Sequence, residues 1–225
     1  ANLVQADLFL ANLSYANLSS ADLSYANLEV ANLFQADLEV ANLSYADLQW
    51  ADLQRASLAG ANLSHAYLED ADLFFASLAG AVANWANFDE ANLQYTNLSG
   101  AYFEGASFRE AWLQSANLQD AYLAGANLTY TDLGNANLVN ANLVGAELDG
   151  ANLGGANLEG ANLCNLASSA SGECGQPEGI TDENGDGYDD VSYDAGVESV
   201  NVGDMNDDGT NDVLDVVLLV NDILL

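Results

Sequence analysis

Alanine stands at every fifth position of this chain from Ala1 to Ala161, and the register never slips. The only departures from Ala in that series are Thr96 and Thr131. A period of five residues matches neither the 3.6-residue turn of an α-helix nor the two-residue alternation of a strand. Each unit must therefore turn the chain by a fixed angle, and the repeat predicts a solenoid of stacked coils.

A second apolar position follows each of these residues by two, and it is almost always Leu, with Asn or Asp most often between them. The positions that depart from Leu are Ala83, Phe88, Phe103 and Phe108. We expect Ala and Leu to face inward, the other three residues of each unit to face solvent, and backbone groups to pair between coils. Because the apolar residues are spread along the repeat, no run is long enough to insert into a membrane.

The unit, as in residues 11–15 with the sequence ANLSY, resembles the pentapeptide-repeat family over residues 1–165. The resemblance implies an all-β fold, a right-handed quadrilateral β-helix with four repeats per coil and about eight coils. At roughly 4.8 Å per layer the rod is on the order of 40 Å long. Residues 166–180 then read as a linker, and residues 181–225 as a separate small module.

Twenty residues per coil place Ala83 beside Phe103, and Phe88 beside Phe108. Because protein cores are close-packed, a small residue next to a large one keeps the core volume constant. We therefore predict that Ala83 accommodates Phe103, and that Ala83→Leu destabilises the rod.

The charge of the chain is strongly one-sided, with 34 acidic and two basic residues and a formal net charge of −32. Direct binding to nucleic acid or to an anionic membrane through a basic patch is excluded. The self-repulsion of such a chain must be offset by cations, by salt, or by spreading the charge along a rod.

Two cysteines, Cys164 and Cys174, flank the end of the repeats. Their spacing fits a disulfide and therefore an extracellular or cell-surface protein, whereas two unpaired thiols are the alternative. The sequence begins within the repeat pattern without Met, so either a leader was removed or the chain is part of a longer protein.

The C-terminal region contains the oxygen spacing of an EF-hand calcium loop, with side-chain oxygens at loop positions 1, 3, 5, 9 and 12. Gly209 stands at the turn in position 6, and position 7 offers a backbone carbonyl. The predicted Ca²⁺ ligands are Asp204, Asn206, Asp208, Thr210, Asp212 and Asp215.

An earlier copy of the loop is less complete, because its position 12 is Tyr193 instead of a carboxylate. Its predicted ligands are Asp182, Asn184, Asp186, Tyr188 and Asp190, with Tyr188 at the carbonyl position. Two aligned copies favour calcium binding over the alternative of solvated turns. Loop and following segment resemble a dockerin-type module, which implies capture by a cohesin-like or cell-surface protein.

The last residues form one apolar stripe at helical spacing. Its members are Val213, Val216, Val217, Val220, Ile223 and Leu224. The stripe needs a partner surface, which is the first calcium loop, the open end of the β-helix, or another molecule.

Outward positions fall into columns twenty residues apart. One column is aromatic and consists of Tyr25, Tyr45, His65 and Trp85. A shorter column pairs Tyr102 with Tyr122. A third column is acidic and consists of Asp70, Glu90 and Glu110. The aromatic column is interpreted as a contact for a neighbouring chain, with carbohydrate binding or internal stacking as alternatives. The acidic column fits a solvated face or a cation site.

No phosphate loop, nucleophile elbow or zinc spacing is found, so we expect no enzyme. The sequence favours a secreted structural rod that self-associates through its calcium-stabilised module, and end-to-end association into fibres is one form of this hypothesis. Two alternatives stay open. One, implied by the family resemblance, is an acidic DNA mimic that inhibits a type II topoisomerase; the other is a dockerin-bearing scaffold.

Overall fold

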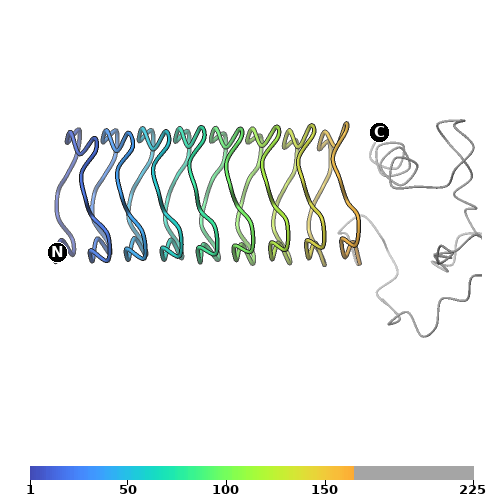
Figure 1. The fold of residues 1–225 in the computed structure, drawn as a ribbon, viewed down its shortest axis with the longest axis horizontal. Helices are drawn as coiled ribbons and strands as arrows, with labels where there is room; N and C mark the ends of the chain where they lie inside the picture. Colours follow the sequence, from blue (N-terminus) through green and yellow to red (C-terminus); the bar gives the residue numbers. More distant parts are fainter. Residues whose placement is uncertain (165–225) are drawn as a thin grey trace, which may run out of the picture.

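The computed structural model describes residues 1–164, which form a straight rod of stacked coils (Figure 1). Each repeat contributes one bridging residue followed by a two-residue turn, and the described residues contain no helix and no longer strand. Parallel bridges join residues twenty apart along the whole rod, from Asn2–Asp22 to Asn142–Asn162. The predicted four-sided β-helix is therefore confirmed for these residues, while the predicted linker 166–180 and module 181–225 lie outside them.

We number the coils by twenties, so that coil 1 is residues 1–20 and coil 8 is residues 141–160. Neighbouring coils exchange backbone hydrogen bonds: Leu3 N–H donates to the Asp22 carbonyl at 2.6 Å, and Asp22 N–H donates to the Ala1 carbonyl at 2.9 Å. Each corner is closed within the coil, as where Ala6 N–H donates to the Leu3 carbonyl at 3.0 Å. This pattern satisfies the backbone without helices or long strands.

The last residue of every repeat through residue 160 adopts the left-handed backbone conformation. Non-glycine residues at this position have φ between 53° and 61°. The conformation costs an L-residue roughly 1–2 kcal/mol, which is why it normally selects glycine. Here, hydrogen bonds to the coil above fix the corner, and only in coil 8 is the position glycine at all four corners.

The core consists of Ala and Leu ladders that are buried from coil 2 to coil 8. The three phenylalanines replace leucines side by side: Phe88 stacks on Phe108 at 4.9 Å between ring centroids, and Phe103 meets both rings edge-on. Ala83 is fully buried next to them. The predicted neighbours are confirmed, and the cost of enlarging Ala83 stays a prediction.

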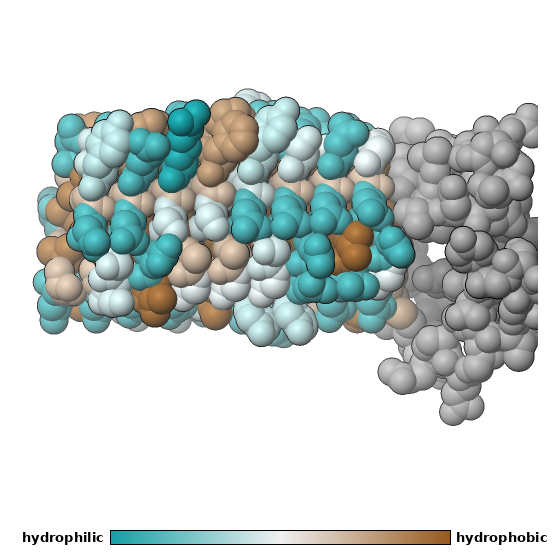
Figure 2. Space-filling model, viewed as in Figure 1, coloured by the Kyte–Doolittle hydropathy of each residue, from teal (hydrophilic) through white to brown (hydrophobic). Residues whose placement is uncertain are grey.

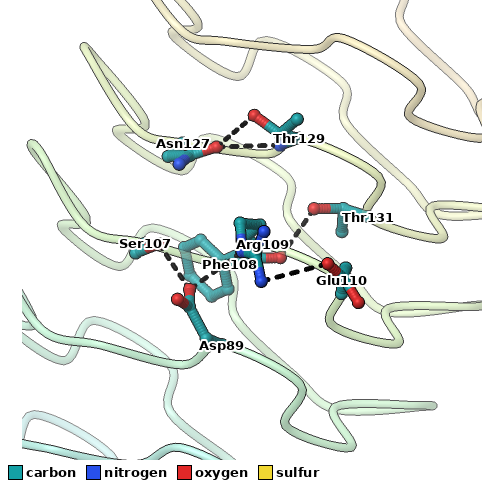
Figure 3. Close-up of polar contacts among 8 residues, drawn as sticks. All are labelled: Asp89, Ser107, Phe108, Arg109, Glu110, Asn127, Thr129 and Thr131. Carbon is teal, nitrogen blue, oxygen red and sulfur yellow. Dashed lines mark hydrogen bonds and ion pairs between the residues drawn. The ribbon is translucent and has the colours of Figure 1, made fainter.

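The two threonines in the Ala series keep their hydroxyls satisfied inside the rod. Thr131 Oγ1 donates to the Phe108 carbonyl at 2.7 Å (Figure 3), and Thr96 Oγ1 donates to the Leu73 carbonyl at 2.9 Å. Both side chains are buried. A buried hydroxyl with a partner avoids the penalty of an unsatisfied polar group, so Thr fits where Ala is the rule.

The Asn and Asp residues between Ala and Leu lie at the surface, as predicted, and they also form hydrogen bonds that the sequence did not reveal. Their Oδ1 atoms accept the backbone N–H two residues later, as from Ser24 N–H to Asp22 at 3.1 Å. Amides also form ladders between coils, where Asn137 Nδ2 donates to Asn117 Oδ1 at 3.0 Å. These side chains therefore fasten the corner and join the coils.

Candidate binding surfaces

The twenty-residue coil brings equivalent turn positions into columns along the rod. Figure 2 shows this on one face, where side chains of similar hydropathy lie in rows parallel to the rod axis. Side chains in one column contact neighbours twenty residues away. These contacts cover part of each side chain, so they determine how much of its surface is left to bind a ligand.

The aromatic column is a self-stacked ladder in its first three members. Tyr25 and Tyr45 stack at 4.8 Å with 2° between ring planes, and Tyr45 and His65 stack at 4.7 Å with 10°. Because each ring covers the face of the next, the ladder presents mainly edges to solvent. Faces that are already covered offer a sugar ring little surface, so the geometry favours the internal-stacking alternative for these residues.

The fourth member of that column, Trp85, lies differently. Its indole ring lies over Gly105, where it leaves no room for a Cβ atom, and no stacked pair joins it to His65 in residues 1–164. The side chain remains 59% exposed. The predicted four-membered ladder is therefore confirmed for three residues, and Trp85 rests on the backbone of the next coil.

Two further ring pairs lie elsewhere on the rod. Tyr102 and Tyr122 stack at 4.7 Å, as their spacing predicts. Phe75 and Tyr95 stack at 5.0 Å, a pair that the sequence analysis missed although the same twenty-residue spacing marks it. Each pair again covers two ring faces.

The acidic column of Asp70, Glu90 and Glu110 runs along one corner through coils 4 to 6, with all three side chains exposed. Arg109 forms an ion pair with Glu110 at 3.1 Å between two half-exposed side chains, which contributes little stability. Asp89 accepts the Ser107 hydroxyl and, at 3.1 Å, the Arg109 N–H (Figure 3).

Within residues 1–164, no group of three or more His, Cys, Asp and Glu side chains is arranged to hold a metal ion. The two readings of the acidic column, a solvated face or a cation site, both stay predictions. Asp22 is held as a carboxylate: the Ser24 hydroxyl and N–H and the Asn42 amide all donate to it, which lowers its pKa below 3.8.

One exposed apolar surface was not predicted from the sequence. We call it the apolar corner, and it consists of Phe9, Leu10, Val30 and Trp50. Leu10, Val30 and Trp50 occupy the same turn position in coils 1 to 3, with exposed fractions of 61%, 39% and 51%, and Phe9 adjoins Leu10 with 48%. The same column becomes acidic at Asp70. Three apolar residues at twenty-residue spacing are the signal that would have revealed this surface.

The predicted calcium ligands all lie outside the described residues: Asp182, Asn184, Asp186, Tyr188, Asp190, Asp204, Asn206, Asp208, Thr210, Asp212 and Asp215. Cys164 is disulfide-bonded. Cys174 lies outside the described residues, so the pairing of these two cysteines stays a prediction. The part of the chain that the structure describes contains no helix that would be able to cross a bilayer.

A family model described as pentapeptide repeats matches residues 1–165 in overlapping stretches. No curated protein matches the chain. Among solved structures, HetL of the cyanobacterium Nostoc sp. strain PCC 7120, a pentapeptide repeat protein involved in heterocyst differentiation regulation, is 36% identical over 72% of this chain and 86% of its own, with a TM-score of 0.30.

Rfr23 of the cyanobacterium Cyanothece 51142, also a pentapeptide repeat protein, is 34% identical over 45% of this chain and 58% of its own, with a TM-score of 0.31. QnrB1, a plasmid-mediated fluoroquinolone resistance protein, is 22% identical over 72% of this chain and 82% of its own, with a TM-score of 0.43. The likeness to QnrB1 concerns the fold alone.

Proposed function

The chain belongs to the pentapeptide repeat family, and from this premise we propose that it is a secreted, non-enzymatic structural protein. Its β-helix is a rigid rod, and its calcium-stabilised C-terminal module joins the rod to other copies. The observation that carries the proposal is the continuity of the rod, since backbone hydrogen bonds join the described coils and the core ladders are buried from coil 2 to coil 8.

Stiffness follows from that continuity. Bending the rod would have to separate backbone pairs between neighbouring coils and open a core whose leucines are almost completely buried from coil 2 onward. The polar side chains stand on corners and faces, where a substrate would not be enclosed as it is in a typical active-site cleft. A stiff body with an outward-facing surface is suited to spacing and assembly.

The C-terminal sequence supports the joining role. Two loops with calcium-ligand spacing precede an apolar stripe that requires a partner surface. Calcium would also reduce the repulsion between copies that each have a net charge of −32. The disulfide at Cys164 supports an oxidising, extracellular or cell-surface location.

The test is the size of the full chain in solution with Ca²⁺ and with a chelator, measured by light scattering and by negative-stain electron microscopy. We expect oligomers or filaments with Ca²⁺ and monomers after chelation. The variant Asp204→Asn/Asp208→Asn should stay monomeric, whereas Asp7→Asn/Asp37→Asn removes the same charge from the rod and should still associate. A chain that is monomeric with saturating Ca²⁺ would refute the self-associating role.

Two alternatives have their own tests. The column of carboxylates on one corner and the net charge favour a DNA mimic, which a gyrase supercoiling assay checks; the structural role predicts no inhibition. The dockerin-like spacing favours a scaffold captured by a cohesin, which would appear as calcium-dependent binding of the monomer to immobilised cohesin domains. Binding to a cohesin without self-association would replace the first proposal with the scaffold.

A further inference from the structure

We propose that the apolar corner of one molecule receives the C-terminal apolar segment, residues 213–225, of a second copy. The inference rests on the proposed function, since it names the surface through which self-association occurs. It places the joining surface on the side wall of coils 1 to 3, well away from the last coil.

The apolar corner is a continuous surface. Leu10 N–H donates to the carbonyl of residue 29, and Val30 N–H donates to the carbonyl of residue 49, so Leu10, Val30 and Trp50 stand directly above one another. Stacked rings elsewhere on the rod give a coil spacing of 4.7–4.8 Å. The corner is therefore on the order of 10 Å long between Leu10 and Trp50, and Phe9 widens it at one end.

Several exposed aromatic side chains on the rod are partly covered by residues of the neighbouring coil. The rings of Tyr25, Tyr45 and His65 cover each other's faces, and Tyr130 lies over Gly150. The apolar corner includes aliphatic side chains that take part in no such ring stacking, so it retains apolar surface for a partner to bury.

The C-terminal segment has an apolar sequence pattern that suits this surface. Its apolar residues repeat at helical spacing over residues 213–224, which corresponds to a length of roughly 16 Å if the segment is helical. One stripe of that length covers the corner and overlaps its ends. Outside residues 1–164, no other stretch of the sequence contains as many closely spaced large apolar residues.

Charge favours the segment of a second copy over the molecule's own segment. The acidic column of Asp70, Glu90 and Glu110 occupies the same corner between the apolar corner and the last coil. Residues 165–212, which are long enough to reach back, are themselves rich in Asp and Glu. A segment that returned along this corner of its own rod would meet like charges, whereas a segment from another rod can approach coils 1 to 3 directly.

The sign of the salt dependence follows from the same charges. Asp7, Glu29, Asp47 and Asp52 lie within three residues of the corner positions in the sequence. Asp212 precedes the segment, and Asp215 and Asp222 lie within it between its apolar residues. Both surfaces are thus apolar and flanked by negative charge. Added salt screens the repulsion between these two negatively charged surfaces and should therefore strengthen their association. An association held by salt bridges would instead weaken as salt is added.

The first experiment places the photo-crosslinker p-benzoylphenylalanine at position 30 of the full chain, with Ca²⁺ present, and maps the products by mass spectrometry. A parallel chain carries the crosslinker at position 40, another exposed valine position that lies outside the corner. We expect a dimer band from position 30 only, with residues 213–225 attached. A monomer band with the same attachment, or a dimer crosslinked to another segment, would overturn the inference.

The second experiment compares Leu10→Ser/Trp50→Ser with Val40→Ser/Tyr130→Ser. Each pair removes one exposed aliphatic and one exposed aromatic side chain, and Tyr130 occupies the same turn position as Trp50. The first pair should raise the concentration needed for association on the order of tenfold or more, while the control pair should leave it unchanged. Equal effects of the two pairs, or association that weakens with added salt, would refute docking at this corner.

The two proposals fail separately. If the parent chain stays monomeric with Ca²⁺, self-association itself is refuted and the corner has no such partner. If the parent associates while the crosslink and the Leu10→Ser/Trp50→Ser effect are both absent, the structural role stands and the docking site is wrong.

Discussion

Core packing between coils 5 and 6 can be tested with a double-mutant cycle at Ala83 and Phe103. Both residues are fully buried, and they occupy the same core column in adjacent coils. Ala83→Leu alone adds three carbon atoms to a site next to Phe103 and Phe88. Phe103→Leu alone removes the ring that packs edge-on against Phe88 and Phe108, at 5.9 Å and 5.1 Å between centroids.

The magnitudes follow from these contacts. Overpacking at Ala83 should cost about 1–3 kcal/mol of unfolding free energy. Replacing the Phe103 ring should cost about 2 kcal/mol, because it leaves a void next to a small residue and loses two aromatic contacts. The double variant restores the Leu pair found in most other coils, so its cost should fall below the sum of the single costs by at least about 1 kcal/mol.

The assay is urea unfolding of the full chain followed by far-ultraviolet circular dichroism. Unfolding midpoints are compared only between variants that share the same slope, because solenoids can lose cooperativity. Amide hydrogen exchange in coils 5 and 6 supplies a local free energy if the slopes differ. Additive costs would show that the two side chains do not share one space, and Ala83→Leu with parental stability would refute the packing described for this region.

Three smaller predictions use the same unfolding assay. Thr131→Val removes the buried hydroxyl donor and should cost about 0.5–1.5 kcal/mol; an unchanged midpoint would mean that the hydrogen bond adds nothing. Gly150→Ala should lower the free energy of unfolding more than Gly125→Ala, because a Cβ at Gly150 meets the Tyr130 ring while Gly125 has open space. Both glycines have nearly equal positive φ, so backbone strain is matched. Equal losses of stability would contradict the position of the ring. The lowered pKa of Asp22 contributes stability above its ordinary value of 3.8 that is lost as the pH falls through the lower folded value. An Asp22→Asn chain should therefore lose less stability than the parent in that acid range, and identical acid profiles would exclude this contribution.

The five-residue period predicted most of the rod, because one repeated corner geometry determines the coil, the core and the columns. Stacking of Tyr25 on Tyr45 follows from spacing alone. The position of Trp85 does not, since it depends on a missing Cβ one coil away, at Gly105. The paired roles of Asn and Asp in corner and ladder also required the path of the backbone, because their hydrogen bonds join residues two and twenty apart.

The apolar corner is the opposite case, because the twenty-residue spacing of Leu10, Val30 and Trp50 is enough to predict it. The predicted calcium ligands belong to a third class. They follow from local oxygen spacing in residues 182–215, and the regular geometry of the rod gives no information about them.

Because all corners have the same geometry, the number of residues between two positions determines whether their side chains lie on the same face of the rod. Since every column is defined by residue number modulo twenty, deleting one five-residue repeat would leave the core ladders filled but rotate everything after it by a quarter turn. The apolar corner of coils 1 to 3 and the acidic column of coils 4 to 6 would then face different directions. Deleting twenty residues would instead shorten the rod by one coil and keep both aligned. Changes in length by whole coils are therefore the ones that preserve which surfaces face the same partner.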